Sequence, residues 1–160
     1  MLMLDACPSL LALAPDGNTS GRLFGPRALY RERVVTSPST DTIDERLDAV
    51  AQQSFRARFQ LRGHERALVH LRGLQAIRRH AEDVITRRLA PAMPDKDGRQ
   101  TPYRGHPVFM AQHATGTCCR GCLERNHQIA RGHELTAPEH RYVIDVIMRW
   151  IEREIPDAPQ

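Results

Sequence analysis

The chain has 160 residues, of which 41% are hydrophobic and 26% are charged, with a formal net charge of +4. This composition is typical of a folded globular protein and excludes a wholly disordered or fibrous chain. The longest apolar stretch without a charge, residues 6–15, is far shorter than the roughly 18 residues that suggest a membrane-spanning helix. We therefore expect one folded domain and no membrane protein.

Residues 1–53 contain short apolar pieces separated by turn-forming residues, and no periodic pattern holds for long. We expect a flexible N-terminal extension here, with at most a helical turn near residues 43–50. The apolar start differs from a secretory signal because Asp5 interrupts it and no Lys or Arg precedes it. The clustered cysteines do not resemble a disulfide framework, so we predict reduced thiols and a cytoplasmic location.

After this extension the spacing of the apolar residues changes from an alternating pattern to a helical one. Residues 55–61 alternate apolar and polar side chains, which predicts a short strand or an extended arm. From residue 64 to residue 89 the apolar side chains recur at steps of three and four. This spacing predicts one long amphipathic helix, with Gly73 as its weak point and Pro91 beyond its end.

The last part of the chain predicts a second helix over residues 136–155. Thr136 and Glu139 have the spacing of a capping box at its start, and apolar residues at helical spacing follow. Two amphipathic helices bury their apolar faces against each other and against the segment between them. We therefore expect a mainly α fold, a small helical bundle over residues 54–155, followed by a short tail at 156–160.

The positive charge is concentrated in the middle third of the chain. Residues 56–104 hold 12 basic and 5 acidic residues, whereas both flanking parts carry a slight acidic excess. A basic block of this kind can bind nucleic acid or an acidic partner, here through the Arg-rich helix. The basic residues are almost all Arg, and no aromatic residues interleave with the block. An arginine-rich surface that is simply exposed to solvent, with no binding role, therefore explains the basic block equally well.

Residues 105–140 form the one chemical cluster, because three of the four cysteines and five of the eight histidines lie there. Cys119 and Cys122 form a C-x-x-C pair, and a helix that begins near Cys119 would project both thiols from one face. His113 and His127 would complete a Cys2His2 tetrahedron, with Cys118 and His106 as alternatives to either histidine. We predict a zinc-binding domain on this basis.

Three further residues have the hydrogen-bonding groups that would support such a site: Gln112, Thr117 and Arg120. Thr117 is also the expected cap of the helix that carries the C-x-x-C pair. If protein side chains fill all four positions, the metal is structural; if one position is open, the metal could activate water.

The same thiols allow a different chemistry. A Cys118 or Cys119 thiolate at a helix N-terminus beside Arg120 would be favoured by the helix dipole and by the positive charge. His113 or His106 could remove the proton, and a second thiol could resolve an oxidised intermediate. A thiol-dependent enzyme or redox protein is thus the main alternative to metal binding, and inert packing of buried cysteines is another.

A set of rare strings resembles a known family. The strings run Arg104-Gly-His-Pro-Val-Phe109, Ala111-Gln-His-Ala114 and Thr117-Cys-Cys-Arg-Gly-Cys-Leu123. They are similar to bacterial and archaeal proteins grouped as domain of unknown function 4186. The resemblance extends over about residues 54–153 and implies a domain there, but it implies no activity.

Overall fold

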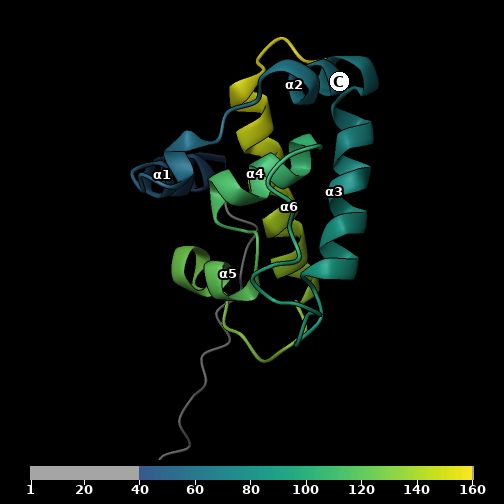
Figure 1. Cartoon of the computed structure of the whole chain (residues 1–160). Helices are drawn as coiled ribbons and strands as arrows, with labels where there is room; N and C mark the ends of the chain where they lie inside the picture. The colour runs from purple at the N-terminus through teal and green to yellow at the C-terminus, as the bar shows by residue number, and fades with distance from the viewer. Residues whose placement is uncertain (1–39, 160) are drawn as a thin grey trace, which may run out of the picture. The chain divides into compact units, whose positions relative to one another are not determined.

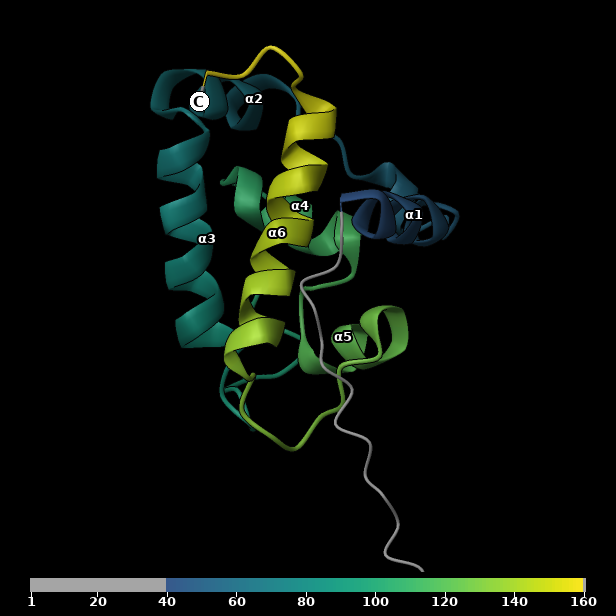
Figure 2. The ribbon, with the colours of Figure 1, turned by 180° about the vertical axis from the view of Figure 1, so that it is seen from behind.

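The structure is a computed structural model that describes residues 40–159, and Figures 1 and 2 show the arrangement of their helices. Its elements are α1 (Thr40–Ala51), the 3-10 helix η1 (Arg56–Arg58), α2 (Gly63–Arg72), α3 (Leu74–Arg88), α4 (Pro107–Thr115), α5 (Arg120–His127) and α6 (Ala137–Glu154). Residues 40–159 contain helices and no strand, so the predicted mainly α fold is confirmed. No helix in this range is long and apolar enough to cross a membrane.

The helix α6 lies at the centre of the fold and packs against α3, α4 and α1 (Figure 2). Val143, Ile147 and Ile151 recur at steps of four along it, and none of the three is exposed to solvent. The predicted capping box is present: the backbone N–H of Glu139 donates to the Thr136 hydroxyl, and the backbone N–H of Thr136 donates to the Glu139 carboxylate. The local sequence thus determines where α6 begins and which face it buries.

The prediction of one long helix over residues 64–89 is wrong in one respect. The chain turns at Gly73 and forms two helices, α2 and α3. Gly73 has a φ of +75°, a backbone conformation that side chains with a Cβ rarely adopt. Its N–H still donates to the Val69 carbonyl at the end of α2. The N–H of Leu74, which opens α3, donates to the Pro159 carbonyl at 2.8 Å. The C-terminal segment therefore provides a hydrogen-bond acceptor for a backbone N–H in the first turn of α3, which has no partner within the helix.

The prediction of a short strand or an extended arm over residues 55–61 is also wrong for Arg56–Arg58, which form the 3-10 helix η1, and the backbone becomes extended only at Phe59. The alternating pattern placed Arg56 on a solvent-exposed face, yet only 7% of this residue is exposed. Its guanidinium turns inward and bonds to groups of α4 and α5 that are far away in sequence. These tertiary contacts outweigh the weak local preference of a seven-residue pattern.

At the N-terminal end of the described chain, α1 buries Ile43, Leu47 and Val50 and packs against α4 and α6. The Arg149 guanidinium on α6 bonds both carboxylate oxygens of Asp44, at 2.8 and 2.6 Å. The helical turn expected near residues 43–50 is thus a helix of 12 residues, and residues 40–51 belong to the packed domain rather than to an extension. The remainder of the expected extension, residues 1–39, lies outside the described residues.

Candidate metal centre

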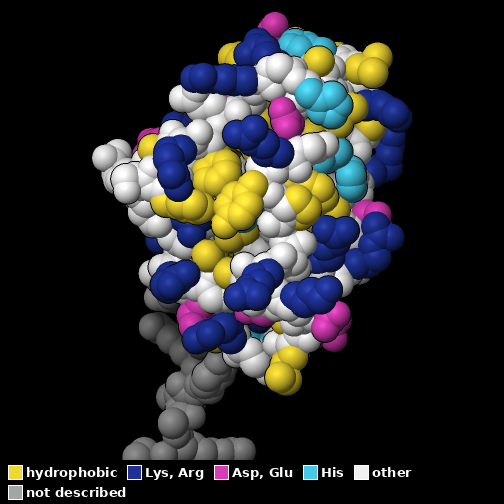
Figure 3. All heavy atoms as spheres, viewed as in Figure 1, with side chains coloured by type: hydrophobic (Ala, Val, Ile, Leu, Met, Phe, Trp, Pro, Cys, Tyr) yellow, Lys and Arg dark blue, Asp and Glu magenta, His cyan; other side chains and the backbone are white. Residues whose placement is uncertain are grey.

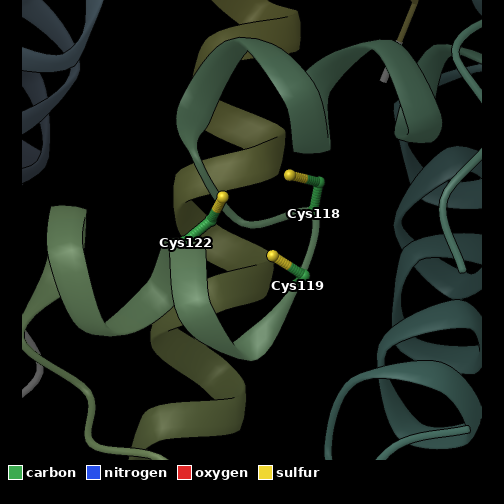
Figure 4. A group of neighbouring side chains, drawn as sticks. All are labelled: Cys118, Cys119 and Cys122. Atoms are coloured by element: carbon green, nitrogen blue, oxygen red, sulfur yellow. The ribbon is translucent and has the colours of Figure 1, made fainter. Parts of the chain in front are cut away.

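Three cysteine side chains converge between α4 and α5 (Figure 4). Cys118 and Cys119 lie on the segment that joins the two helices, and Cys122 lies in the first turn of α5. Their Sγ atoms all lie within 4.8 Å of one another. A tetrahedral zinc ion with bonds of 2.3 Å would require sulfur atoms about 3.8 Å apart. The three thiols therefore need only a small contraction to bind one ion.

The start of α5 positions two of these thiols. Cys119 is the N-cap residue with an extended backbone, and its carbonyl accepts hydrogen bonds from the N–H groups of Cys122 and Leu123 at 3.1 and 3.0 Å. The Asp97 carboxylate accepts the N–H of Arg120 at 2.9 Å and so supplies the negative group that a helix N-terminus favours. Thr117, the expected cap, does not occupy that position. The helical turn places Cys119 and Cys122 side by side, as the C-x-x-C spacing predicts.

Two guanidinium groups neighbour the sulfur of Cys122. The Nη2 atom of Arg56 lies 3.3 Å from this sulfur, and the Nη2 atom of Arg125 lies 3.5 Å from it. Arg56 is almost completely buried, and its Nη1 atom donates to the His113 carbonyl at 2.6 Å. One buried arginine therefore connects the end of α4 to the thiol of α5.

The same contacts make the three thiols electrostatically unequal. Hydrogen bonds from Cys118 and Cys119, and then from Arg56 and Arg125, hold the pKa of Cys122 far below the usual value for a thiol, although burial opposes this. The pKa of Cys118 is raised, chiefly because its thiol donates toward the other two sulfurs. The two guanidinium groups therefore favour a thiolate at Cys122, whereas the sequence suggested Cys118 or Cys119 as the reactive thiolate.

His113 lies beside this cluster but outside the group of converging ligand atoms, which contains sulfur only. Its Nε2 atom lies 3.2 Å from the Thr101 carbonyl, which can only accept a hydrogen bond, so Nε2 carries the proton. Its Nδ1 atom is buried and has no hydrogen-bond partner. Burial lowers the pKa of His113, and the imidazole is therefore held neutral with a free lone pair on Nδ1.

The other two predicted histidines have different contacts. His127 uses both ring nitrogens, Nε2 with the Thr115 carbonyl at 2.7 Å and Nδ1 with the Tyr142 hydroxyl at 2.9 Å. His106 caps α4 by accepting the N–H of Val108 on Nδ1, and its Nε2 atom lies 2.6 Å from a ring nitrogen of His80. The structure thus places His127 and His106 in hydrogen bonds of the scaffold rather than among the converging sulfurs.

Comparison with family models identifies a match to the domain of unknown function DUF4186 over residues 44–152, which is more than half of the chain. The chain belongs to the DUF4186 family. The matched range begins inside α1 and ends inside α6, so it contains the whole α4–α5 segment with its three thiols. No solved structure matches the chain.

The three polar residues expected to support the site of this DUF4186 domain have separate roles. Gln112 donates to the Thr117 carbonyl at 3.2 Å, and the Thr117 hydroxyl lies 3.0 Å from that of Thr115. These bonds shape the turn between α4 and α5. Arg120 is 1% exposed and donates to two backbone carbonyls of the segment that follows α5, those of Ala130 and His133, each at 2.8 Å. Arg120 therefore secures the segment after the site and does not bond to the sulfurs.

Several residues of the site were not predicted from the sequence. Arg56 lies 57 positions before His113, and Thr101, whose hydroxyl donates to the Cys118 carbonyl at 2.9 Å, precedes that cysteine by 17 positions. No local pattern marks residues that meet the thiols only after the chain folds. One signal was available for Asp97, because a carboxylate is favourable near the positive end of a helix dipole.

The Arg-rich helix α3 is partly neutralised within the fold. Arg78 pairs with Asp145 of α6, and Arg87 pairs with Asp83 in the same helix. The Arg88 guanidinium lies over the Phe109 ring, 5.7 Å from its centroid. Binding of nucleic acid or of an acidic partner by this helix stays a prediction, and these pairings leave less free charge than the sequence suggests.

Proposed function

We propose that this domain binds a metal ion, with zinc as the best match, through the thiolates of Cys118, Cys119 and Cys122. The observation that carries the proposal is the convergence of the three Sγ atoms within 4.8 Å of one another. Thiolate ligands favour zinc among the abundant divalent ions, because magnesium and calcium prefer oxygen. Cys118, an alternative in the sequence prediction, becomes a primary ligand here.

Charge compensation supports the same proposal. Three thiolates around Zn²⁺ carry a net charge of −1, which is costly to bury without a neighbouring cation. Arg56 and Arg125 provide positive groups within hydrogen-bond distance of the Cys122 sulfur. Hydrogen bonds from such neighbours orient metal ligands and tune the affinity of a site.

We propose His113 as the fourth ligand, in agreement with the sequence prediction, and leave His127 and His106 in the scaffold. Metal-binding histidines commonly donate the proton of their second nitrogen to a carbonyl. His113 has this arrangement toward Thr101, with Nδ1 buried and unpartnered. Coordination would require the end of α4 to move toward the thiols, because His113 is not among the converging ligand atoms. With four protein ligands the metal would be structural and would tie α4 to α5.

The test is metal analysis of purified protein combined with thiol titration. We expect about one zinc per chain, three thiols that react only after chelation, and loss of zinc in Cys122→Ser. Cys7→Ser is the comparison variant, because retention of zinc in it would assign the binding to the three converging thiols. His113→Ala should weaken zinc retention, whereas His127→Ala should alter stability more than zinc content.

Metal-free protein at every stage of purification, together with no uptake of added zinc, would refute the proposal. Equal zinc content in His113→Ala and in the wild-type protein would refute only the assignment of the fourth ligand. Cobalt substitution distinguishes metal bound by the three cysteines from metal bound elsewhere on the protein. Thiolate-to-cobalt charge-transfer bands and a tetrahedral ligand-field spectrum appear only when the metal is bonded to sulfur.

Thiol redox chemistry is the second candidate function, favoured by the Arg56 and Arg125 guanidinium groups beside the Cys122 sulfur, which lower the pKa of its thiol. A stabilised thiolate next to two further thiols is the arrangement that a redox cysteine requires. In this case Cys122, rather than Cys118 or Cys119, would be the reactive thiolate. Fast alkylation of one thiol at pH 6 in metal-free protein would support this function, and protection of all three thiols by zinc would exclude it. A cytoplasmic location remains proposed, because either function needs reduced thiols.

A further inference from the structure

A stack of aromatic rings runs from the neighbourhood of the thiols to the surface. Tyr103 and His113 stack at 4.4 Å between ring centroids with an interplanar angle of 11°, and Phe59 lies nearly parallel to Tyr103 at 6.4 Å. Phe55 packs edge-on against Phe59 at 5.3 Å. His113 is buried, whereas 40% of Phe55 and 61% of Tyr103 are exposed. The stack therefore ends in two rings that solvent can reach.

One hollow borders the rings of Phe55, Phe59 and Tyr103, and a second hollow shares Arg58, Arg104 and Met110 with it. The hollow beside the rings has a volume of about 490 Å³, and the second has about 590 Å³ and adds Arg62 and Glu65. On the face shown in Figure 3, hydrophobic side chains gather near the middle, and Lys and Arg side chains surround them. The shared wall residues make the two hollows adjoining parts of one groove.

Three arginines and one carboxylate line this groove. Arg58, Arg62 and Arg104 form no ion pair within residues 40–159, although Glu65 interacts electrostatically with Arg104. The Arg58 guanidinium instead lies 4.8 Å from the centroid of the exposed Phe55 ring. Glu65, the one carboxylate among the lining residues, accepts the N–H of Gly105 at 3.0 Å. The groove therefore favours an anionic ligand with flat apolar parts.

We propose that this groove binds single-stranded nucleic acid. Tyr103 and Phe55 would stack on unpaired bases, and the three arginines would bind the phosphates between them. Exposed aromatic rings beside a positively charged groove are the arrangement by which proteins bind single strands with little sequence preference. The proposal is independent of the metal and differs from the sequence prediction, which placed nucleic-acid binding on the Arg-rich helix.

The side chains that line the groove favour single-stranded nucleic acid over a duplex, a membrane surface or an acidic peptide. Bases in a duplex already stack on one another and have no free face for Tyr103. A membrane surface or an acidic peptide would engage the arginines alone. A single strand offers phosphates for the arginines and unpaired bases for the exposed rings of Tyr103 and Phe55, which lie edge-on to each other with centroids 6.5 Å apart.

Binding is tested with the full-length protein as purified and fluorescein-labelled 15-mers of deoxythymidine and of uridine, by fluorescence anisotropy at several salt concentrations. We expect saturable binding at low salt, weaker binding of a duplex of the same length, and affinity that falls as salt rises. Tyr103→Ala should weaken binding roughly ten-fold or more, whereas Tyr103→Phe should retain it because the ring remains. Arg104→Ala should reduce the salt dependence by about the contribution of one phosphate contact, a slope of roughly 0.7.

Arg79→Ala is the matched control, because Arg79 is an exposed arginine of α3 outside the groove. It should leave the affinity close to that of the wild-type protein. Each variant must keep the metal content and helical signal of the wild type, so that loss of folding is recognised. Absence of saturable binding to either 15-mer at low salt would overturn the proposal. Equal losses in Arg79→Ala and Arg104→Ala, or binding to phosphatidylserine vesicles but not to the 15-mers, would also overturn it.

Discussion

The α3–α6 interface and the α4–α5 segment are both buried, but different forces stabilise them. Between α3 and α6 the buried residues are aliphatic, such as Ile77, Ile85 and Ile147, each at most 2% exposed. In contrast, seven of the nine buried polar residues found among residues 40–159 lie within residues 112–127. Aliphatic burial is insensitive to pH and ligands, whereas each buried polar group requires a partner. The two regions share one aliphatic core, to which Val108 and Leu123 also belong, and the α4–α5 segment adds buried polar groups whose stability depends on their partners and on pH.

The aliphatic region is tested most severely by Ile147→Ala. This side chain is fully buried between α6 and its neighbours, so its truncation leaves a cavity. We expect a loss of about 2–5 kcal/mol in the free energy of unfolding, measured by urea denaturation of the metal-loaded protein. The zinc content of the folded fraction should not change. A loss of less than about 1 kcal/mol would show that the α3–α6 interface is not the main source of stability.

The polar region should respond to acid through His127, whose pKa burial lowers to about 4. The unfolded chain binds this proton near pH 6.5, so the stabilisation is complete above pH 6.5 and is lost as the pH falls toward 4. The loss approaches roughly 3 kcal/mol at the acid end. We expect His127→Gln to be less stable than the wild type at neutral pH and to lose less stability on acidification. Parallel stability curves for the two proteins between pH 7 and pH 4 would contradict this expectation.

The turn between α4 and α5 is tested by Gly116→Ala. Gly116 has a φ of +76°, and a Cβ atom there would lie 2.7 Å from the Asn126 side-chain nitrogen. We expect a destabilisation of about 2 kcal/mol from backbone strain and from displacement of Asn126, which bonds the Cys122 carbonyl. Gly98→Ala is the control, because Gly98 also has a positive φ but no atom within 4 Å. Equal effects of the two substitutions would eliminate the contribution of the Asn126 contact.

The smallest expected effect is that of Thr136→Ala at the start of α6. The substitution removes the side-chain half of the capping box and should cost about 1 kcal/mol in thermal or urea unfolding. Thr136→Ser keeps the hydroxyl and should stay within roughly 0.5 kcal/mol of the wild type. Equal losses for both variants would mean that the methyl group, and not the cap, is the stabilising feature.

The sequence predicted those features that depend on neighbouring residues. The cap and apolar face of α6 follow from the spacing of Thr136, Glu139 and the aliphatic residues after them, and all of these interact within a few turns. The C-x-x-C spacing likewise predicted that Cys119 and Cys122 project together, because positions three apart share one face of a helix. For the same reason the helical spacing of the apolar residues was sufficient to predict a mainly α fold.

Tertiary contacts decided the rest. At the break after Gly73 the N–H of Leu74 donates to the Pro159 carbonyl, and the Arg56 guanidinium reaches the end of α4 and the sulfur of Cys122. The histidines differ in the same way, since His127 finds partners in Thr115 and Tyr142 while Nδ1 of His113 finds none. A ligand pattern in sequence specifies which atoms can bond, but the partners that compete for those atoms come from distant segments and are fixed only when the helices pack.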